Sequence, residues 1–381
     1  MIDEISIHNF KSIEDLKLPL GRVTVLIGEN GSGKSNILEA VAVLAAAAGR
    51  ILAPEVVAAM GVRIPDGPKM VSAFEGKKFS EYTQFAFSAG GKTMQWQVSI
   101  FDSLWRTYMP SVLDLLVLQE ELQHIKSGDI PVKEANRIIM EEMRSRELLP
   151  IAESLPDFII YSPENTSLRA FEQEGQVRLL GYKGEGLFKV LKEFFRPGNE
   201  ERLAKLKENL SLLGWFVDFK LPSDLFMGER SIEITDRFVG KTQLLDQRSA
   251  NEGFLFLLFY FVLFLSPDTP KFFAIDNIDA ALNPKLCAEL MARLVQLAKE
   301  NDKQVILTTH SPAILDGLNL HDEEQKLYVV FRDDLGRTKV RLVPPPEAPP
   351  ANLPPPPPSR LPLKLSHAFM RGLLGGLPKN F

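Results

Sequence analysis

One eight-residue segment restricts the possible folds of this chain more than any other feature. Residues 28–35 read Gly-Glu-Asn-Gly-Ser-Gly-Lys-Ser and fit the pattern G-x-x-x-x-G-K-[ST]. The apolar, partly β-branched residues 22–27 predict a buried strand before it, and the Ala- and Leu-rich residues 36–48 predict a helix after it. In this setting glycines let successive backbone N–H groups turn inward as an anion nest at a helix N-terminus. The segment therefore predicts a phosphate-binding loop in a nucleotide-binding α/β fold.

The residue types of this loop indicate which groups would hold a nucleotide. Lys34 can reach the β- and γ-phosphates, and the Ser35 hydroxyl can bind Mg²⁺. The other nucleotide contacts predicted in the loop are Asn30, Gly31, Ser32 and Gly33. Lys11 and Ser12 could also reach the nucleotide, although strand residues of this type are more often structural.

Composition limits the remaining classes of protein. The chain has 381 residues, 45% hydrophobic and 24% charged, which suits two domains or one large domain with an insertion. Its net charge of −5 gives no bulk argument for nucleic-acid binding and leaves a local basic patch open. With one cysteine and no apolar signal segment within residues 1–20, we expect a cytoplasmic protein. The most hydrophobic run, 253–265, is shorter than the roughly 20 residues of a membrane helix and predicts a buried core helix.

Two further apolar segments end in polar residues suited to phosphate chemistry. Residues 272–275 lead into Asp276, and residues 305–309 lead into His310. Because the carboxyl ends of parallel strands meet at one sheet edge, both side chains are expected beside the phosphate loop. Asp276 would then bind Mg²⁺ together with Ser35, and His310 would contact the γ-phosphate. A lone histidine is more often structural, but the predicted sheet edge favours the functional interpretation.

Taken as a set, these motifs resemble the ABC-type ATPase head of the RecF/SMC/OLD kind, a bacterial AAA-type family found in DNA repair and anti-phage defence. Residues 7–13 are similar to its N-terminal strand motif, and residues 28–35 match its Walker A loop. Residues 276–283 match the Walker B and D-loop segment, whose usual sequence in ABC proteins is D-E-P-T-S-A-L-D. His310 falls on the position of the H-loop. Residues 249–252 resemble the signature motif S-G-G-Q/E, and Gln84 is the candidate for the Q-loop.

The resemblance implies a fold and a mechanism. The fold would be an α/β P-loop NTPase of the ABC-ATPase-head type, a mixed sheet flanked by helices, with a helical insertion and a proline-rich C-terminal tail. The cofactors would be ATP and Mg²⁺, and two heads would pair head to tail around ATP, giving a homo-oligomer. The signature residues Ser249, Asn251 and Glu252 would then contact the γ-phosphate bound by the other subunit.

Two departures from the family pattern bear on the rate of hydrolysis. The signature has Ala250 and Asn251 where the family prefers glycines. Asn277 stands where the family has a glutamate that orients or deprotonates the attacking water, and an amide cannot accept that proton. Because general-base catalysis is worth about 10²–10⁴-fold, we expect slow hydrolysis. Asp279 could replace the base, because in an extended backbone it would project to the same side as Asn277.

The element pattern divides the chain into four segments. Residues 1–102 would form the N-terminal part of the head, with Walker A and a β-hairpin, and residues 103–155 a helical insertion. Residues 156–343 would carry the signature, Walker B, D-loop and H-loop. Residues 344–381 would be a polyproline spacer of roughly 45 Å followed by an apolar docking segment.

Three functions remain in competition. The first is an ATP-dependent sensor of a bacterial anti-phage defence system that controls a separately encoded effector such as a nuclease, because no nuclease constellation follows residue 343. The second is a RecF-like repair ATPase that clamps DNA, which would require a basic surface and salt-sensitive binding. The third, a transporter's nucleotide-binding subunit, is disfavoured by the long insertion and the degenerate signature, and no membrane partner is expected.

Overall fold

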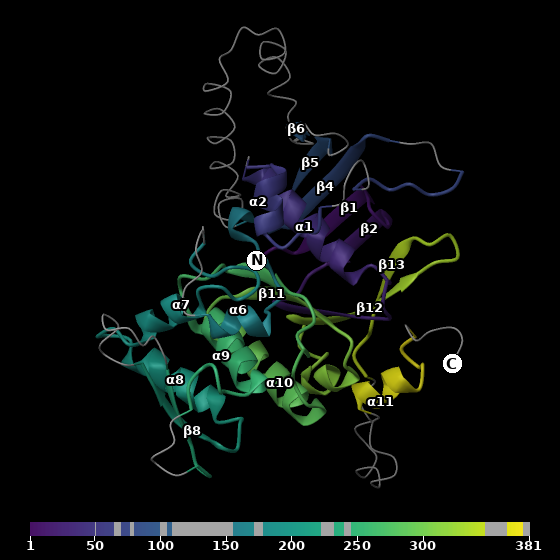
Figure 1. Ribbon diagram of the computed structural model, residues 1–381. Helices are drawn as coiled ribbons and strands as arrows, with labels where there is room; N and C mark the ends of the chain where they lie inside the picture. Colours follow the sequence, from purple (N-terminus) through teal and green to yellow (C-terminus); the bar gives the residue numbers. More distant parts are fainter. Residues whose placement is uncertain are drawn as a thin grey trace, which may run out of the picture. The chain divides into compact units, whose positions relative to one another are not determined.

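A computed structural model describes ten stretches of the chain: residues 1–49, 51–64, 70–76, 80–99, 105–108, 155–170, 178–221, 232–239, 245–346 and 364–375 (Figure 1). The chain divides into two compact units. The first unit comprises Met1–Gly21, Gly31–Phe158 and Val330–Val340, and the second comprises Arg22–Asn30, Ile159–Val329 and Arg341–Phe381. Most of the predicted helical insertion and of the polyproline spacer lies outside the described residues, so the four-segment division stays a prediction.

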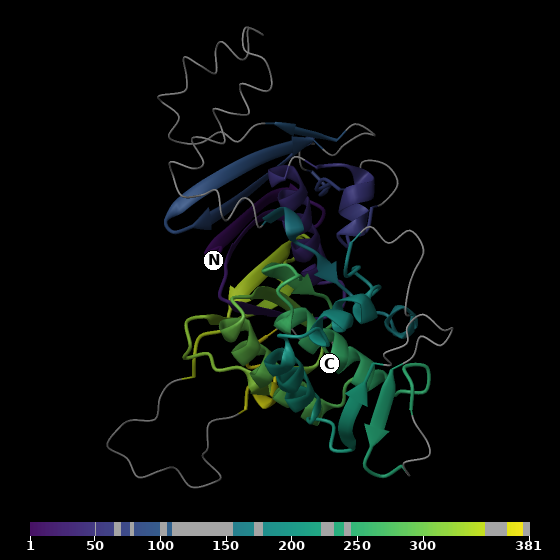
Figure 2. The ribbon, with the colours of Figure 1, turned by 90° about the vertical axis from the view of Figure 1, so that its left-hand side faces the viewer.

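The first unit contains an antiparallel sheet of order β2-β1-β4-β5-β6. Its strands are β1 (Glu4–Phe10), β2 (Ile13–Pro19), β4 (Tyr82–Ala89), β5 (Lys92–Ser99) and β6 (Arg106–Tyr108). Figure 2 shows β4 and β5 in blue beside β1 and β2 in purple. The predicted hairpin is confirmed, because β4 and β5 pair from Tyr82 with Ser99 to Ala89 with Lys92. Helix α1 (Lys34–Ala48) packs against β1, β4, β5, α2 (Pro54–Ala59) and η1 (Leu155–Asp157).

The second unit is built on parallel strand pairs. The sheet has the order β13-β12-β3-β11-β10-β7, and β12–β3, β3–β11, β11–β10 and β10–β7 are all parallel. Its strands are β3 (Val23–Ile27), β7 (Ile160–Tyr161), β10 (Phe272–Ile275), β11 (Gln304–Thr309), β12 (Gln325–Arg332) and β13 (Thr338–Leu342). Every residue of β3, β10 and β11 is buried, as their apolar sequences predict.

The most hydrophobic run of the sequence forms the central core helix of the second unit. Helix α9 (Glu252–Leu265) buries all twelve residues from Phe254 onward, which confirms the prediction of a core helix. It packs against α6 (Asn165–Arg169), α7 (Leu187–Phe194), α8 (Glu200–Leu210) and α10 (Pro284–Glu300). Strands β8 (Phe216–Lys220) and β9 (Glu233–Asp236) form a separate antiparallel pair. Within the described residues, no helix is both long enough and apolar enough to cross a membrane.

The last described stretch, residues 364–375, belongs to the second unit. Helix α11 (Leu365–Met370) packs against the 3-10 helix η2 (Pro312–Gly317) and buries Phe369. The backbone N–H and the hydroxyl of Ser366 donate to the carboxylate of Asp316 at 3.0 and 2.8 Å. The segment after His310 is a short 3-10 helix, and the Ser311 side chain forms no N-cap hydrogen bond at its start.

Candidate nucleotide-binding site

The phosphate loop has the backbone that its glycines predict. Gly31 and Gly33 adopt φ values of 77° and 106°, a region that suits glycine. The carbonyl of Gly31 accepts from Arg332 Nε at 2.9 Å, and that of Ser32 accepts from the Thr338 hydroxyl at 3.0 Å. In a trans peptide the following N–H points the opposite way, so the amides of Ser32 and Gly33 face away from these two side chains. The loop therefore presents N–H groups on the face opposite β12 and β13.

A chain of polar side chains supports the loop from behind. Asn36 Nδ2 donates to Ser12 Oγ at 2.6 Å, and the hydroxyls of Ser12 and Thr338 are 2.7 Å apart. Because Thr338 donates onward to the Ser32 carbonyl, the hydrogen bonds run in one direction from α1 to the loop. A Cβ atom at Gly33 would lie 2.0 Å from the Thr338 hydroxyl, so this contact also requires glycine.

Three observations test whether these residues fit a nucleotide phosphate. The Ser32 hydroxyl is buried and has no hydrogen-bond partner among the described residues, which is unusual for a buried polar atom. Helix α1 has fifteen residues and no acidic residue in its first turn, so its dipole leaves positive potential at the loop. Lys34 adds a buried amine at the same end of the helix. The donor set fits a polyphosphate.

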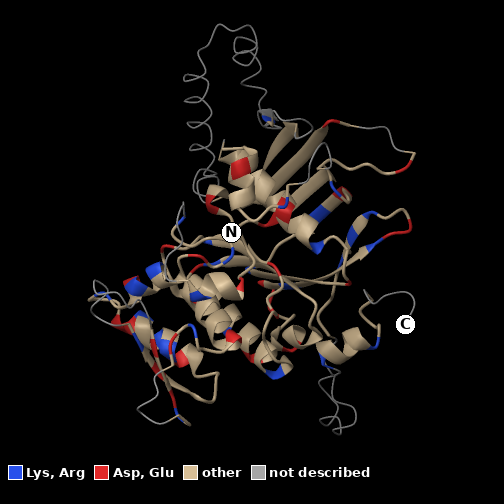
Figure 3. Cartoon of the chain, viewed as in Figure 1, with Lys and Arg blue, Asp and Glu red and all other residues tan. Residues whose placement is uncertain are grey.

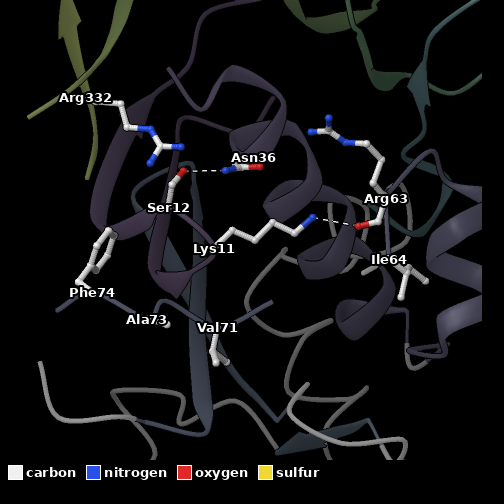
Figure 4. Close-up of a pocket in the computed structure, with 9 residues that line it drawn as sticks. All are labelled: Lys11, Ser12, Asn36, Arg63, Ile64, Val71, Ala73, Phe74 and Arg332. Atoms are coloured by element: carbon white, nitrogen blue, oxygen red, sulfur yellow. Dashed lines mark hydrogen bonds between the residues drawn. The ribbon is translucent and has the colours of Figure 1, made fainter. Parts of the chain in front are cut away.

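An open hollow of about 660 Å³ lies in the first unit beside this loop (Figure 4). Its polar lining comes from Lys11, Ser12, Asn36, Arg63 and Arg332, of which three carry positive charge. Its apolar lining comes from Ile64, Val71, Ala73 and Phe74. Asn36 also donates to Ser12, and Arg332 donates to the carbonyl of Gly31 in the phosphate loop. These two residues therefore both line the hollow and help to hold the loop. This combination suits an anionic ligand with an apolar end.

A buried carboxylate organises the cationic side of the hollow. Glu39 of α1 is 2% exposed and accepts from Lys11 Nζ at 2.5 Å and from Arg63 Nε at 2.7 Å. Lys11 also donates to the carbonyl of Arg63 at 3.0 Å, as Figure 4 shows. Burial lowers the pKa of the Lys11 ammonium, against the opposite effect of Glu39. Lys11 is therefore fixed in place by partners on two elements.

In the second unit, the strand ends meet at one sheet edge as the sequence predicts. The register pairs Ile27 with Thr309 and Ile275 with Leu307, so Gly28, Asp276 and His310 all follow the carboxyl ends of parallel strands. Thr308 Oγ1 donates to Asp276 Oδ1 at 2.5 Å and accepts the N–H of Asn277 at 2.9 Å. The phosphate loop thus leaves the sheet at the edge where Asp276 lies.

The run after Asp276 is a turn and not an extended strand. Asn277 has φ 57°, and the N–H of Ala280 donates back to the Asn277 carbonyl at 3.0 Å. The expectation that Asp279 projects beside Asn277 from an extended backbone is therefore wrong. Instead, Asp279 Oδ1 accepts from the Thr309 hydroxyl at 2.6 Å and from the N–H of His310 at 3.2 Å. Asp279 is thus held against the H-loop, and its role in catalysis stays a prediction.

The candidate signature residues lie at the start of α9. Ser249, Asn251 and Glu252 are exposed, whereas Ala250 between them is buried. The Asn251 side chain accepts from the N–H of Phe254 at 2.8 Å and caps the helix. Asp246 accepts from the backbone and hydroxyl of Ser249, both at 2.8 Å. Burial works to raise the pKa of Asp246, but these hydrogen bonds and that of Arg248 leave the pKa below its usual value.

Gln84 is not at this sheet edge. It lies within β4 of the antiparallel sheet, paired with His8 and Gln97, so the Q-loop suggestion is wrong. The strand whose end borders Asp276 is β7, because Ile275 pairs with Tyr161. The segment that follows β7, from Ser162 into α6, therefore leaves the sheet next to the strand that ends before Asp276, a placement that the sequence analysis did not predict. The described residues hold no group of three or more His, Cys, Asp or Glu side chains that could form a metal site by itself.

The comparisons with known proteins assign the family. Residues 113–316 match the family described as "AAA domain, putative AbiEii toxin, Type IV TA system", and residues 1–81 match the AAA ATPase domain. The chain belongs to the first of these two families, whose match covers more than half of its residues. It is therefore an AAA-type P-loop ATPase.

Related proteins and structures agree with this family. An OLD nuclease of Thermus scotoductus (strain ATCC 700910 / SA-01) is 44% identical over 41 residues, which cover 11% of this chain and 8% of that protein. The matched region is thus a small part of the relative's length. An Smc head bound to the C-winged helix domain of ScpA has a TM-score of 0.57 at 17% identity, covering 90% of this chain and 97% of that chain.

A second Smc head gives the same result. This domain, with an extended coiled coil and bound to the C-terminal domain of ScpA, is derived from Pyrococcus furiosus and has a TM-score of 0.50 at 17% identity. The aligned part covers 90% of this chain and 96% of that chain. At such identity the likeness concerns the fold alone, and it confirms the predicted ABC-type head.

Proposed function

We propose that this AAA-type ATPase is a slow ATP- and Mg²⁺-dependent switch, cytoplasmic, whose ATP-bound state is a pair of heads. The observation that carries the proposal is Asn277, which directly follows Asp276 at the carboxyl end of β10. An amide cannot take a proton from water, so hydrolysis loses general-base assistance worth about 10²–10⁴-fold. A long-lived ATP-bound state is what a switch requires.

Each part of the candidate site has a proposed role in holding ATP. The amides of Asn30 to Gly33 and the amine of Lys34 bind the phosphates. Ser35 and Asp276 bind Mg²⁺, which supplies charge neutralisation between the β- and γ-phosphates. His310 contacts the γ-phosphate, and Asp279 positions the H-loop backbone.

The second head would contribute its signature residues. Ser249, Asn251 and Glu252 are exposed at the N-terminus of a fourteen-residue helix, where backbone N–H groups and the helix dipole favour an anion. In the proposed pair they contact the γ-phosphate bound by the other subunit. The likeness to Smc heads supports a head of this shape.

The biological role that we propose is the sensor of an anti-phage defence system that acts through a separately encoded effector, such as a nuclease. The AbiEii-type family description and the OLD nuclease similarity support this choice. The alternative is a RecF-like ATPase that clamps DNA. Figure 3 shows cationic and acidic residues interspersed along α7 and α8, where Lys207 pairs with Asp218 at 2.6 Å. Tight duplex binding that needs ATP and falls steeply with salt would favour the alternative.

Turnover and mass in solution test the ATP switch directly. The wild type should hydrolyse ATP at about 0.001–0.1 s⁻¹, which is the median enzyme rate of about 10 s⁻¹ reduced by the loss of the base. It should pair with ATP and Mg²⁺ and separate with ADP. Lys34→Ala should abolish ATP turnover and ATP-dependent pairing. Lys17→Ala, which changes an exposed lysine of β2, should leave turnover and pairing unchanged. Fast turnover by a wild-type monomer would contradict the proposal.

A further inference from the structure

One arginine holds the backbone of the signature loop from the side of α6. Arg169 Nη1 donates to the carbonyls of Gln247 at 2.8 Å and Arg248 at 2.5 Å, and Nη2 donates to the carbonyl of Ala250 at 2.8 Å. Its Nε donates to Asn165 Oδ1 at 2.7 Å. Four of the five guanidinium N–H groups are therefore engaged, and three of them hold the signature loop.

The opposite side of the same peptides is held by Asp246. The N–H groups of Arg248 and Ser249 donate to Asp246 Oδ1 at 3.0 and 2.8 Å. In two consecutive peptide groups, 247–248 and 248–249, the carbonyl therefore accepts a hydrogen bond from Arg169 and the N–H donates one to Asp246. The peptide between Ala250 and Asn251 also has its carbonyl on Arg169, so the N–H of Asn251 points away from the guanidinium.

Asn165 adds a second connection between α6 and the signature residues. Its Nδ2 donates to Glu252 Oε1, while its Oδ1 accepts from Arg169. The buried members of the loop, Gln247 and Ala250, lie toward α6 and the core, and Ser249, Asn251 and Glu252 are exposed. The clamp therefore fixes which side chains and amides of the loop face outward.

We propose that Arg169 is a positioning residue that holds residues 247–251 in the shape that contacts the nucleotide of a second copy of this chain. This inference rests on the proposed pairing of heads around ATP. Lysine would keep the charge but has a single ammonium, which cannot hold three diverging carbonyls in a planar fork. The role of Arg169 is therefore expected to depend on its guanidinium and not only on its charge.

The test uses the full chain and measures ATP affinity, pairing and turnover. Arg169→Ala should lower turnover and ATP-dependent pairing at least tenfold while leaving the affinity of the separated protomer for ATP within twofold of wild type. Arg169→Lys should give an intermediate loss, and Asn165→Ala a smaller one. The matched control is Arg202→Ala, which should behave as wild type: this arginine of α8 donates from Nη1 to Asn199 Oδ1 at 2.7 Å and lies over the ring of Phe194.

Mixing variants separates a role toward the partner from a role in folding. In a mixture of Arg169→Ala and Lys34→Ala, a mixed pair combines an intact phosphate loop from one subunit with an intact signature clamp from the other. Each mixed pair has one competent site, so turnover should recover to at most about a quarter of wild type, the value that complete random pairing would give. Neither variant alone should show this recovery of ATP turnover.

The outcomes distinguish this inference from the function on which it rests. If the wild type pairs with ATP but the mixture recovers no turnover, Arg169 does not act on the partner's nucleotide and the inference is overturned. If Arg169→Ala weakens ATP binding to the separated protomer, the arginine acts within its own site, which also overturns it. If the wild type never pairs with ATP, the proposed function itself fails. Should Arg169→Ala not fold, Arg169→Lys and Asn165→Ala in the same mixtures decide the question.

Discussion

The hydroxyl of Thr308 donates to the carboxylate of Asp276 at 2.5 Å, so the strand that ends at the H-loop orients the proposed Mg²⁺ ligand. Partners of this kind fix the orientation of a metal-binding carboxylate, and their loss costs about 10–100-fold in metal affinity or activity. Thr308→Val should therefore raise the Mg²⁺ concentration for half-maximal ATP turnover by about tenfold or more. Thr308→Ser keeps the hydroxyl and should stay close to wild type. Equal Mg²⁺ dependence in both variants would contradict the prediction.

Substitutions of Asn277 directly test the proposed slow hydrolysis of ATP. Its φ of 57° is tolerated well by asparagine, whereas most other residues lose about 1–2 kcal/mol in this region. Asn277→Glu should speed ATP hydrolysis by about 10²-fold and shorten the lifetime of the ATP-bound pair, at some cost in stability. Asn277→Asp supplies a carboxylate that tolerates this backbone and controls for strain. A folded Asn277→Glu protein with normal ATP affinity and unchanged turnover would remove the argument for Asn277 as the rate-limiting substitution.

The strands and the core helix could be predicted because their sequences are locally unambiguous. The buried strands β3, β10 and β11 are largely apolar runs, and the residues singled out from the sequence, Gly28, Asp276 and His310, directly follow them. The sheet-edge rule for parallel strands then brought Gly28, Asp276 and His310 to one edge without further information. The family assignment followed from the same residues.

The remaining features depend on partners that are distant in sequence or on backbone angles. Thr338 supports the phosphate loop from 306 residues away, and nothing in its own neighbourhood indicates that contact. The turn at Asn277 depends on one backbone dihedral angle, which the sequence does not reveal. The prediction that assumed a strand, with side chains alternating every two residues, therefore placed Asp279 wrongly. Gln84 was chosen by residue type, but β4 belongs to the antiparallel sheet. Arg169 lies on a five-residue helix with no periodicity to reveal it.

Gly33 and Gly31 separate steric from conformational requirements in the phosphate loop. Both have positive φ, but an added Cβ meets the Thr338 hydroxyl at 2.0 Å at Gly33 and nothing within 4 Å at Gly31. Gly33→Ala should abolish measurable ATP binding, because it displaces the hydroxyl that holds the Ser32 carbonyl. Gly31→Ala carries only a backbone penalty of about 1–3 kcal/mol and should bind ATP weakly. Titration with a fluorescent ATP analogue measures both, and equal losses would show that the contact with Thr338 is unimportant.

Lys303 predicts a rise in stability at alkaline pH. The residue is 2% exposed, and its amine donates to the carbonyls of Ser266 and Thr269 at 2.9 and 2.8 Å. Burial lowers its pKa from 10.5 to about 8 in the folded chain. Between these two pH values the unfolded chain binds more protons, so the free energy of unfolding rises with pH. Below pH 8 both states are protonated, and this contribution no longer changes with pH.

A variant pair isolates this contribution from the other titrating groups. Lys303→Met should lose the rise in the free energy of unfolding, measured by urea between about pH 7.5 and 10, which amounts to about 3 kcal/mol in full. Lys205→Met removes a partly exposed lysine that pairs with Glu300 and serves as the matched control, which should keep the rise. Parallel profiles for Lys303→Met and wild type would show that the Lys303 amine keeps its ordinary pKa.

Asp279 decides between a displaced catalytic base and a positioning carboxylate. Its Oδ1 accepts from the Thr309 hydroxyl and the N–H of His310, contacts that an amide oxygen can also make. Asp279→Asn should therefore keep ATP turnover within about threefold of wild type, whereas Asp279→Ala frees the H-loop and should lower turnover by about tenfold or more, as loss of a supporting hydrogen bond does in a metal site. If Asp279→Asn instead abolishes turnover while ATP binding and pairing persist, the carboxylate acts as the base. Slow hydrolysis could then no longer be attributed to Asn277, because the general base would have moved two residues along the D-loop.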